Sequence, residues 1–152
     1  MTPNQQAFLD MIAHSEIGPA LLAVSDNGYN VLVGSTPARP LLFDSYGKHP
    51  GILNKAMNST AAGRYQLLYR YWLAYTKQLK LAGFGHEVQD VIALQQIKEC
   101  RALAAIEAGN IELAIKRCAH IWASLPGAGY GQHENSMDVL VAAYLTAGGG
   151  IA

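Results

Sequence analysis

Apolar residues recur at helical spacing over most of this chain, and one long stretch rich in glycine, proline and asparagine interrupts the pattern. A first helix is predicted from Thr2 to about Glu16, and helices are predicted again from Ser59 to about Thr146. Between Pro19 and Ser59, short alternating apolar pieces lie between turn residues, which is typical of a small β-hairpin region. The pattern predicts an α+β fold, a mostly helical body with one small early β element and a cleft between the two parts.

Both ends of the first helix carry clear signals. Thr2 and Gln5 have the spacing of a capping box, with a proline at the first helical position between them. Gly18 and Pro19 stop the helix shortly after Glu16. The sequence therefore places Glu16 at the C-terminal end of an apolar helix.

Four further helices are expected after Ser59-Thr60, which is a candidate N-cap. Their expected ranges are about 60–82, 87–108, 111–125 and 134–146. Gly109 is the stop signal of the second range, whose inward positions are predicted to be Ala93, Ile97, Cys100 and Ala104. A glycine-rich loop over residues 126–132 separates the last two helices.

Length and charge exclude several classes of protein. A chain of 152 residues is expected to form a single domain over 1–152. Its 11 Lys+Arg and 11 Asp+Glu residues cancel, so it lacks the basic excess that binds nucleic acid. Its longest apolar stretch has seven residues, whereas a membrane-spanning helix needs roughly 20, so no membrane insertion is expected. The first residues carry no Lys or Arg of a secretion signal, which predicts a product that stays in the cytoplasm.

Neither a metal nor a cofactor is expected. The five histidines show no paired spacing on a predicted helix, and the two cysteines match no zinc or redox motif. The glycines of residues 127–131 lead out of a helix, whereas a phosphate-binding loop leads from a strand into one. We therefore interpret the cysteines as ordinary buried thiols and the histidines as structural or surface residues.

Glu16 is a candidate general acid because of its position. The helix dipole disfavours a negative charge at a C-terminal end, and burial raises the pKa of a carboxyl group further. Both effects favour the protonated acid that glycoside cleavage needs near neutral pH, where a pKa of roughly 6 is suitable. The alternative is a solvated glutamate at a helix end.

A second cluster, residues 58–66, combines small residues with Ser, Thr, Tyr and Gln at a predicted helix start. Small residues let a ligand approach the backbone, and the polar groups suit a neutral polar ligand such as a sugar. Tyrosine adds an apolar face and a hydroxyl group, which makes Tyr65 a candidate sugar contact. The alternative is that Tyr65 and Tyr75 pack in the core.

Four blocks of the chain, in the same order, closely resemble the bacteriophage lambda endolysin family. They contain Phe-Leu-Asp-Met with Ser-Glu near the first helix end, the run Asn-Ser-Thr-Ala-Ala-Gly-Arg-Tyr-Gln-Leu-Leu, the run Ala-Leu-Gln-Gln-Ile-Lys-Glu, and the run Ile-Trp-Ala-Ser-Leu-Pro-Gly-Ala-Gly-Tyr-Gly-Gln, in residues 7–16, 58–68, 93–99 and 121–132. The resemblance covers about residues 6–149. It implies a lysozyme-like fold and lytic transglycosylase activity on the β-1,4 bond between N-acetylmuramic acid and N-acetylglucosamine.

The resemblance also implies roles for individual residues. Glu16 matches the family's catalytic glutamate. Ser59, Gly63 and Gln66 match a Ser…Gly-x-x-Gln element that binds substrate beside the glutamate, and Tyr130 lies in a loop that resembles one lip of the cleft. With Tyr65, these are the candidate substrate-binding residues.

Two other functions remain open at this point. A hydrolysing muramidase would use a second carboxylate, Asp26 or Asp44, to activate water. A non-catalytic glycan-binding module would not need Glu16. The resemblance implies peptidoglycan glycan strands as partners and, for its release, a separate holin. A monomer is expected. The enzyme would then stay in the host cytoplasm until it passes through holin lesions into the periplasm.

Overall fold

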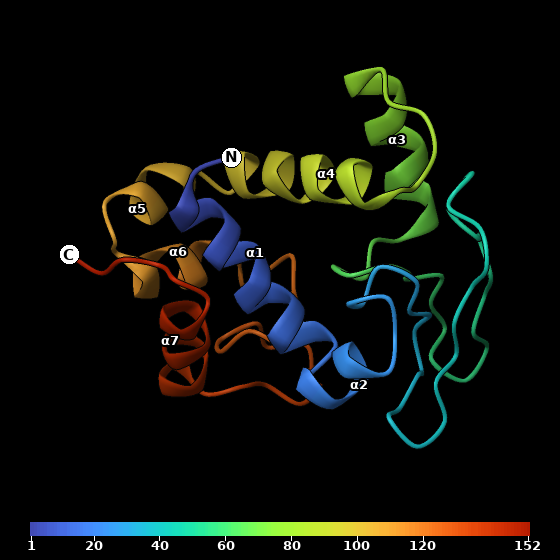
Figure 1. Ribbon diagram of the computed structural model, residues 1–152, viewed down its shortest axis with the longest axis horizontal. Coiled ribbons are helices and arrows are strands. Elements are labelled where there is room, and N and C mark those ends of the chain that lie inside the picture. Colours follow the sequence, from blue (N-terminus) through green and yellow to red (C-terminus); the bar gives the residue numbers. More distant parts are fainter. The chain divides into compact units, whose positions relative to one another are not determined.

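The computed structural model describes residues 1–152. The contacts within the chain divide these residues into two compact units. Unit 1 comprises Met1–Glu16 with Ala93–Ala152, and unit 2 comprises Ile17–Ile92. The helices are α1 (Pro3–Glu16), α2 (Pro19–Ala23), α3 (Tyr69–Leu79), α4 (His86–Glu99), α5 (Leu103–Glu107), α6 (Ile111–Cys118) and α7 (Met137–Thr146) (Figure 1). None of these helices combines the length and the apolar character that crossing a membrane requires.

Helix α1 is the centre of unit 1. It packs against α5 and α7, and α6 packs against both of these helices. Its inward and lateral side chains are completely buried, namely Ala7, Phe8, Leu9, Met11, Ile12 and Ala13. Its start is as predicted, because the Gln5 N–H donates to Thr2 Oγ1 at 3.1 Å and the Thr2 N–H donates to Gln5 Oε1 at 3.3 Å. The capping box is therefore confirmed.

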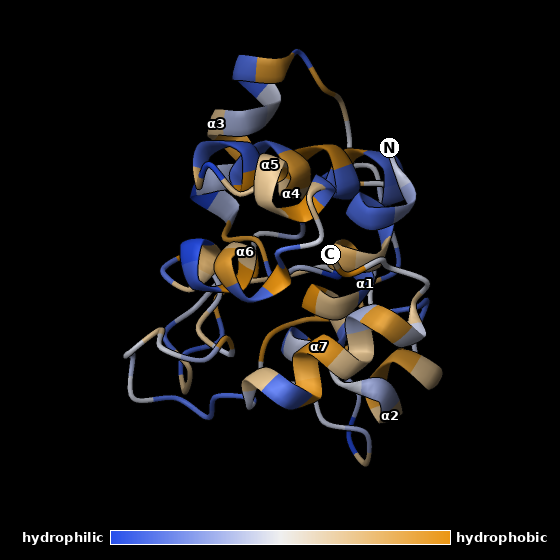
Figure 2. Cartoon of the chain, turned by 90° about the vertical axis from the view of Figure 1, so that its left-hand side faces the viewer, coloured by the Kyte–Doolittle hydropathy of each residue, from blue (hydrophilic) through white to orange (hydrophobic).

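Helix α7 is mostly hydrophobic along its length, as Figure 2 shows. Ser136 caps its first turn by accepting the Val139 N–H at 3.3 Å. Leu140 and Tyr144 are fully buried in unit 1. The helix begins at Met137, so the predicted start at about residue 134 was too early.

The prediction of one helix over residues 87–108 was wrong, because this range forms two helices, α4 and α5. Arg101 separates α4 from α5 by adopting a left-handed conformation with φ of 58°. Its N–H donates to the Lys98 carbonyl at 2.9 Å, and its own carbonyl accepts from the Arg117 guanidinium at 2.7 Å. The break shifts the helical register, so Ala104 is exposed where the sequence pattern placed it inward.

The predicted β-hairpin is only weakly formed in unit 2. Four isolated antiparallel bridges are present and no continuous strand, among them the bridge between Val31 and Leu42. Two backbone bonds flank that bridge, from the Leu32 N–H to the Leu41 carbonyl at 2.8 Å and from the Phe43 N–H to the Asn30 carbonyl at 3.0 Å. Prolines at positions 37 and 40 lack the N–H that would extend the pairing.

Helix α3 begins at Tyr69, so Ser59-Thr60 is not its adjacent N-cap as predicted. Residues 61–67 instead form bridges and a turn. Thr60 still contributes, because its Oγ1 accepts the first free N–H of the helix, that of Tyr69, at 3.1 Å. The cap is therefore supplied from nine residues upstream.

The core of unit 2 lies between α3, the first half of α4 and the bridged loops. Four of its side chains are buried, Ala62, Leu67, Phe84 and Ile92, and partly buried apolar residues pack around them, namely Leu32, Phe43, Trp72, Tyr75, Leu81 and Val88. Buried His49 ties a loop to this core. Its Nδ1 accepts the Gly51 N–H at 3.0 Å, so Nε2 carries the proton and donates to the Leu67 carbonyl at 2.7 Å.

Candidate active site

Glu16 is the last residue of α1, at the helix end that the sequence predicted. Its carboxyl group is partly buried in unit 1, and hydrogen bonding from the Ser124 hydroxyl and backbone N–H acts to lower its pKa. The segment that carries Ser124 follows α6 and is 108 positions away in the sequence. The structure therefore adds Ser124 to the site, a residue that no spacing rule would single out.

Burial raises the pKa of Glu16 from its ordinary value of 4.5 to about 7, and the two hydrogen bonds from Ser124 oppose this rise. No charged neighbour is among the causes of the shift. Near neutral pH the carboxyl group is thus populated in both forms, one that can donate a proton and one that can accept it. This agrees with the direction predicted from the helix end and from burial.

The raised pKa predicts how stability depends on pH. Between pH 4.5 and about 7 the folded state binds the Glu16 proton more tightly than the unfolded chain, so the free energy of unfolding falls as pH rises. E16Q lacks this titration. We expect the free energy of unfolding of E16Q to exceed that of the wild type by up to about 3 kcal/mol above pH 7, and to equal it below about pH 4. Urea unfolding at both pH values measures the difference, and an equal difference at both would contradict the shift.

Ser15 and Asn135 contact Ser124 and each other through hydrogen bonds. The hydroxyl groups of Ser15 and Ser124 lie 2.7 Å apart, and the Asn135 side-chain nitrogen donates to Ser15 Oγ at 3.1 Å and to the Ser15 carbonyl at 3.3 Å. The Asn135 backbone N–H also donates to the Ser124 carbonyl at 2.8 Å. The sequence analysis identified neither residue, because three separate segments contribute to the cluster.

The loop that contains Tyr130 is held within unit 1. Glu134 accepts the N–H of Gly127 at 2.9 Å and that of Gly129 at 3.1 Å, and these bonds lower its pKa. The exposed Tyr130 donates its hydroxyl to the His120 carbonyl at 2.7 Å. The residue as a whole is 57% exposed.

The other candidate residues, Ser59, Gly63, Tyr65 and Gln66, lie together in unit 2, in and beside the turn at residues 62–67. Ser59 Oγ accepts the Ala61 N–H at 3.1 Å, which leaves its own proton for another acceptor. Gln66 Nε2 donates to the carbonyls of Gly63 at 2.8 Å and Val31 at 3.3 Å. Both side chains therefore shape the turn and still keep polar capacity.

Gly63 has a structural reason to be glycine. Its φ is +85°, and a Cβ atom there would overlap Gln89 Oε1 and lie 2.9 Å from Phe84 Cζ. Gln89 is buried and fully used, because it accepts the Arg64 N–H at 2.9 Å and donates to the carbonyls of Tyr29 at 3.0 Å and Phe84 at 2.8 Å. The turn therefore depends on close backbone approach at Gly63.

Tyr65 is buried, and its hydroxyl is engaged within unit 2. It donates to Asp90 Oδ1 at 2.6 Å and accepts from Arg64 Nη1 at 3.0 Å. Tyr29 donates to the same Asp90 oxygen at 2.9 Å. This is the core alternative of the sequence analysis, in which Tyr65 supports the turn and Asp90 links it to α4.

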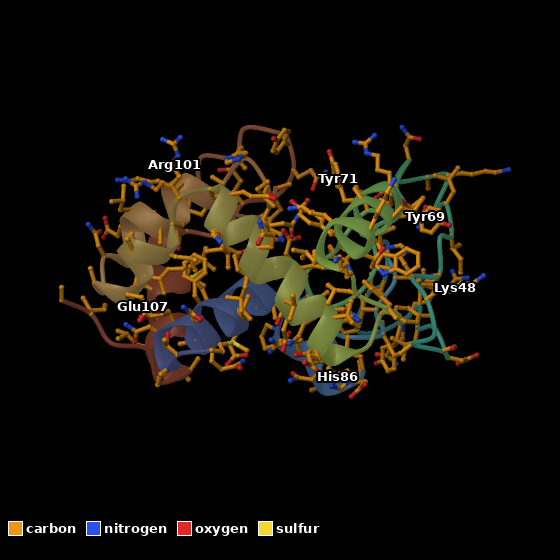
Figure 3. The ribbon with its side chains drawn as sticks, turned by 90° about the horizontal axis from the view of Figure 1, so that it is seen from above. Lys48, Tyr69, Tyr71, His86, Arg101 and Glu107 are labelled. Atoms are coloured by element: carbon orange, nitrogen blue, oxygen red, sulfur yellow. The ribbon has the colours of Figure 1, made fainter.

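Asp26, a possible second carboxylate, already has two donors in unit 2. Its Oδ2 accepts the Tyr46 hydroxyl at 2.5 Å and lies 2.6 Å from Nε2 of the exposed His86, the first residue of α4 (Figure 3). The His86 ring stacks on Tyr29 with centroids 3.9 Å apart. The hydrogen bonds that Asp26 accepts from Tyr46 and His86 lower the pKa of Asp26, so its carboxyl group is ionised and anchored. Asp44, the other possibility, is exposed.

Metal ligands do not gather anywhere in the chain. The structure contains no group of three His, Cys, Asp or Glu side chains that could hold an ion. Both cysteines are free thiols, with Cys118 buried and Cys100 half-buried. Glu16 is the carboxyl group whose pKa burial raises to about 7.

Comparison with known proteins finds relatives along nearly the whole chain. A family model described as Endolysin matches residues 6–151. The endolysins of Escherichia phage lambda and Escherichia phage P2 are each 50% identical to the chain, over 150 and 155 residues, and cover 96% of it; the chain covers 92% and 93% of them. A bacteriophage lambda lysozyme complexed with a chitohexasaccharide matches with a TM-score of 0.91 at 48% identity, over 100% of this chain and 98% of that one. Another structure of lysozyme from bacteriophage lambda gives 0.82 at 46% identity, with the same coverage.

Proposed function

Since the chain belongs to the endolysin family, we propose that it cleaves the β-1,4 bond between N-acetylmuramic acid and N-acetylglucosamine by lytic transglycosylation. The similarity to endolysins and to a lysozyme indicates a peptidoglycan-cleaving enzyme that lyses the bacterial cell wall. The proposal of transglycosylation in place of hydrolysis rests on the chemistry available to Glu16.

The observation that carries the proposal is that burial places the pKa of Glu16 near 7. As an acid, Glu16 protonates the glycosidic oxygen while the bond from that oxygen to the muramyl C1 breaks. As a carboxylate, it then accepts the proton of the muramyl C6 hydroxyl, whose oxygen bonds to C1 and closes a 1,6-anhydro ring. One residue with a pKa near the working pH serves both steps.

A hydrolysing muramidase would need a second carboxylate to activate water or to attack C1. Asp26 is held by Tyr46 and His86, and Glu134 is held by two backbone N–H groups. A carboxylate stabilised in its ionised form by such donors is a weak base. The internal C6 hydroxyl removes the need for a second carboxylate, and its fixed position gives it a high effective concentration.

We assign the binding of sugar hydroxyl and acetamido groups to Ser59, Gln66 and Tyr130. Ser59 and Gln66 keep polar capacity beside the turn of unit 2, and Tyr130 is exposed. Gly63 and Tyr65 support this role by shaping the turn. The chitohexasaccharide bound to the lambda lysozyme, a chain of N-acetylglucosamine, supports a glycan strand as the ligand.

The products of peptidoglycan digestion test the proposal directly. We expect muropeptides that end in 1,6-anhydromuramic acid, one water lighter than hydrolysis products by mass spectrometry. Glycan with O-acetylated muramyl C6 positions should resist cleavage, because the internal nucleophile is blocked. D26N and D44N should keep activity within about tenfold, or about 1.4 kcal/mol in the barrier.

Two outcomes would instead establish the hydrolysing muramidase. One is efficient release of fragments with new reducing ends. The other is a loss of about a thousandfold or more in D26N or D44N when the variant still folds. Circular dichroism of each variant provides the folding control.

The setting of the reaction is part of the same proposal. The enzyme stays in the host cytoplasm until a separate holin opens lesions in the membrane, and it then acts as a monomer on glycan strands in the periplasm. The zero net charge of the chain supports weak long-range attraction to an anionic polymer. Because the enzyme is held in the cytoplasm, lysis of intact cells should require the holin, whereas permeabilised cells should lyse without it.

A further inference from the structure

Hydrogen bonds join Asn135, Ser15 and Ser124 in unit 1, and Ser124 hydrogen bonding acts on the Glu16 carboxyl group. We propose that Asn135, Ser15 and Ser124 are positioning residues that hold the Glu16 carboxyl group in one orientation and stabilise its ionised form. This inference rests on the proposed function, because it assigns Glu16 the catalytic role. The three residues act through Glu16 and do not themselves need to touch the substrate.

The direction of the chain follows from the chemistry at its two ends. The Ser15 carbonyl can only accept, so the Asn135 side-chain atom 3.3 Å from it is the amide nitrogen, and this nitrogen also donates to Ser15 Oγ. At the other end, an ionised Glu16 can only accept, so the Ser124 hydroxyl donates to it. Ser124 Oγ then accepts from the Ser15 hydroxyl at 2.7 Å. Each hydroxyl has one donor and one acceptor.

This arrangement explains how a buried carboxyl group can still act as an acid. Burial alone favours the protonated form, which would hold its proton too tightly to give it up readily to the glycosidic oxygen. Donation from the Ser124 hydroxyl and backbone N–H stabilises the carboxylate, and the donors behind Ser124 keep its proton directed at Glu16. A transglycosylase needs both forms of this residue in every cycle.

The hydrogen-bonded chain Asn135–Ser15–Ser124, here called the relay, forms only when three segments meet. Ser15 lies in the last turn of α1, Ser124 follows α6, and Asn135 precedes the N-cap of α7. The Asn135 backbone N–H also donates to the Ser124 carbonyl at 2.8 Å, so the segments of Ser124 and Asn135 are joined directly as well as through Ser15. The relay is therefore built by the packing of unit 1 and does not depend on a mobile side chain at the surface.

The test is a carbon-detected NMR titration of the Glu16 carboxyl group without substrate, together with pH–rate profiles. S124A should raise the Glu16 pKa by about one pH unit, because a hydrogen bond to a charged group is lost. Its kcat should fall about tenfold with KM within about twofold, since the reacting group and not the glycan contacts is affected. S124T keeps the hydroxyl and should restore both values, and N135A should shift the pKa in the same direction by a smaller amount.

S136A is the matched control, because it removes a hydroxyl that caps α7 and does not reach Glu16. It should lower the melting temperature and leave the Glu16 pKa unchanged. An unchanged Glu16 pKa and unchanged kcat in folded S124A would overturn the relay. If S124A does not fold, S15A and N135A decide, and wild-type Glu16 titration in both would equally overturn it. Continued formation of anhydro products in that case leaves the proposed function intact, whereas an active E16Q would refute the proposed function and the positioning role with it, whatever the S124A titration shows.

Discussion

E16Q is expected to lose at least about a thousandfold of cell-wall clearing activity, equivalent to about 4 kcal/mol in the barrier. Glutamine has nearly the same shape as glutamate, and its amide oxygen can still accept from Ser124. It has no proton to give to the glycosidic oxygen and no carboxylate to accept one from the C6 hydroxyl. The turbidity of permeabilised cells over time measures the loss.

Two further measurements make the result specific. E112Q makes the same chemical change on an exposed residue of α6 in unit 1, and it should clear cells like the wild type. Glycan binding by E16Q, followed by calorimetry with a chitin oligosaccharide, should survive. Retention by E16Q of more than a few per cent of the wild-type rate would remove Glu16 from the centre of the mechanism.

G63A is expected to destabilise the protein by about 3 kcal/mol or more. The positive φ alone costs an L-residue about 1–2 kcal/mol. The added Cβ also displaces the buried Gln89 side chain, which serves three backbone groups and leaves each with an unpaired polar atom when it moves. Urea unfolding followed by circular dichroism gives the change in the free energy of unfolding.

G127A isolates the contribution of the backbone conformation. Gly127 has the same φ of +85°, but no atom lies within 4 Å of the position that its Cβ would take. Its destabilisation should remain at about 1–2 kcal/mol, so the larger effect of G63A is due to the overlap with Gln89. If G63A is as stable as G127A but loses glycan binding, Gly63 is a ligand contact first and a structural residue second.

Helix α1 was largely predictable because its signals are local. The capping box, the apolar face and the Gly18-Pro19 stop all act within one helix and agree with one another, so its start and its end at Glu16 were found. The break at Arg101 was not predictable in this way. No glycine or proline marks it, and the Arg117 side chain that holds the Arg101 carbonyl comes from a different helix.

The candidate site divides along the same line. Glu16 follows from a helix end and a family motif, both readable in a few residues. Ser124 is 109 positions from Ser15, and their contact exists only after α1, α6 and α7 have packed. Tyr65 shows the converse, because its type and position suggest a ligand contact although the fold uses its hydroxyl for Asp90 and Arg64.

The burial of α1 has a consequence for how the enzyme can fail. The backbone amides of Met11, Ile12 and Ala13 should exchange with solvent deuterium only when unit 1 opens as a whole, because these residues are completely buried in a helix that packs against α5 and α7. Glu16 follows these residues in the same helix and interacts with Ser124, so a partly opened state in which Glu16 alone is loosened should not accumulate. Heat inactivation should therefore follow the cooperative opening of unit 1, with little loss of activity before it.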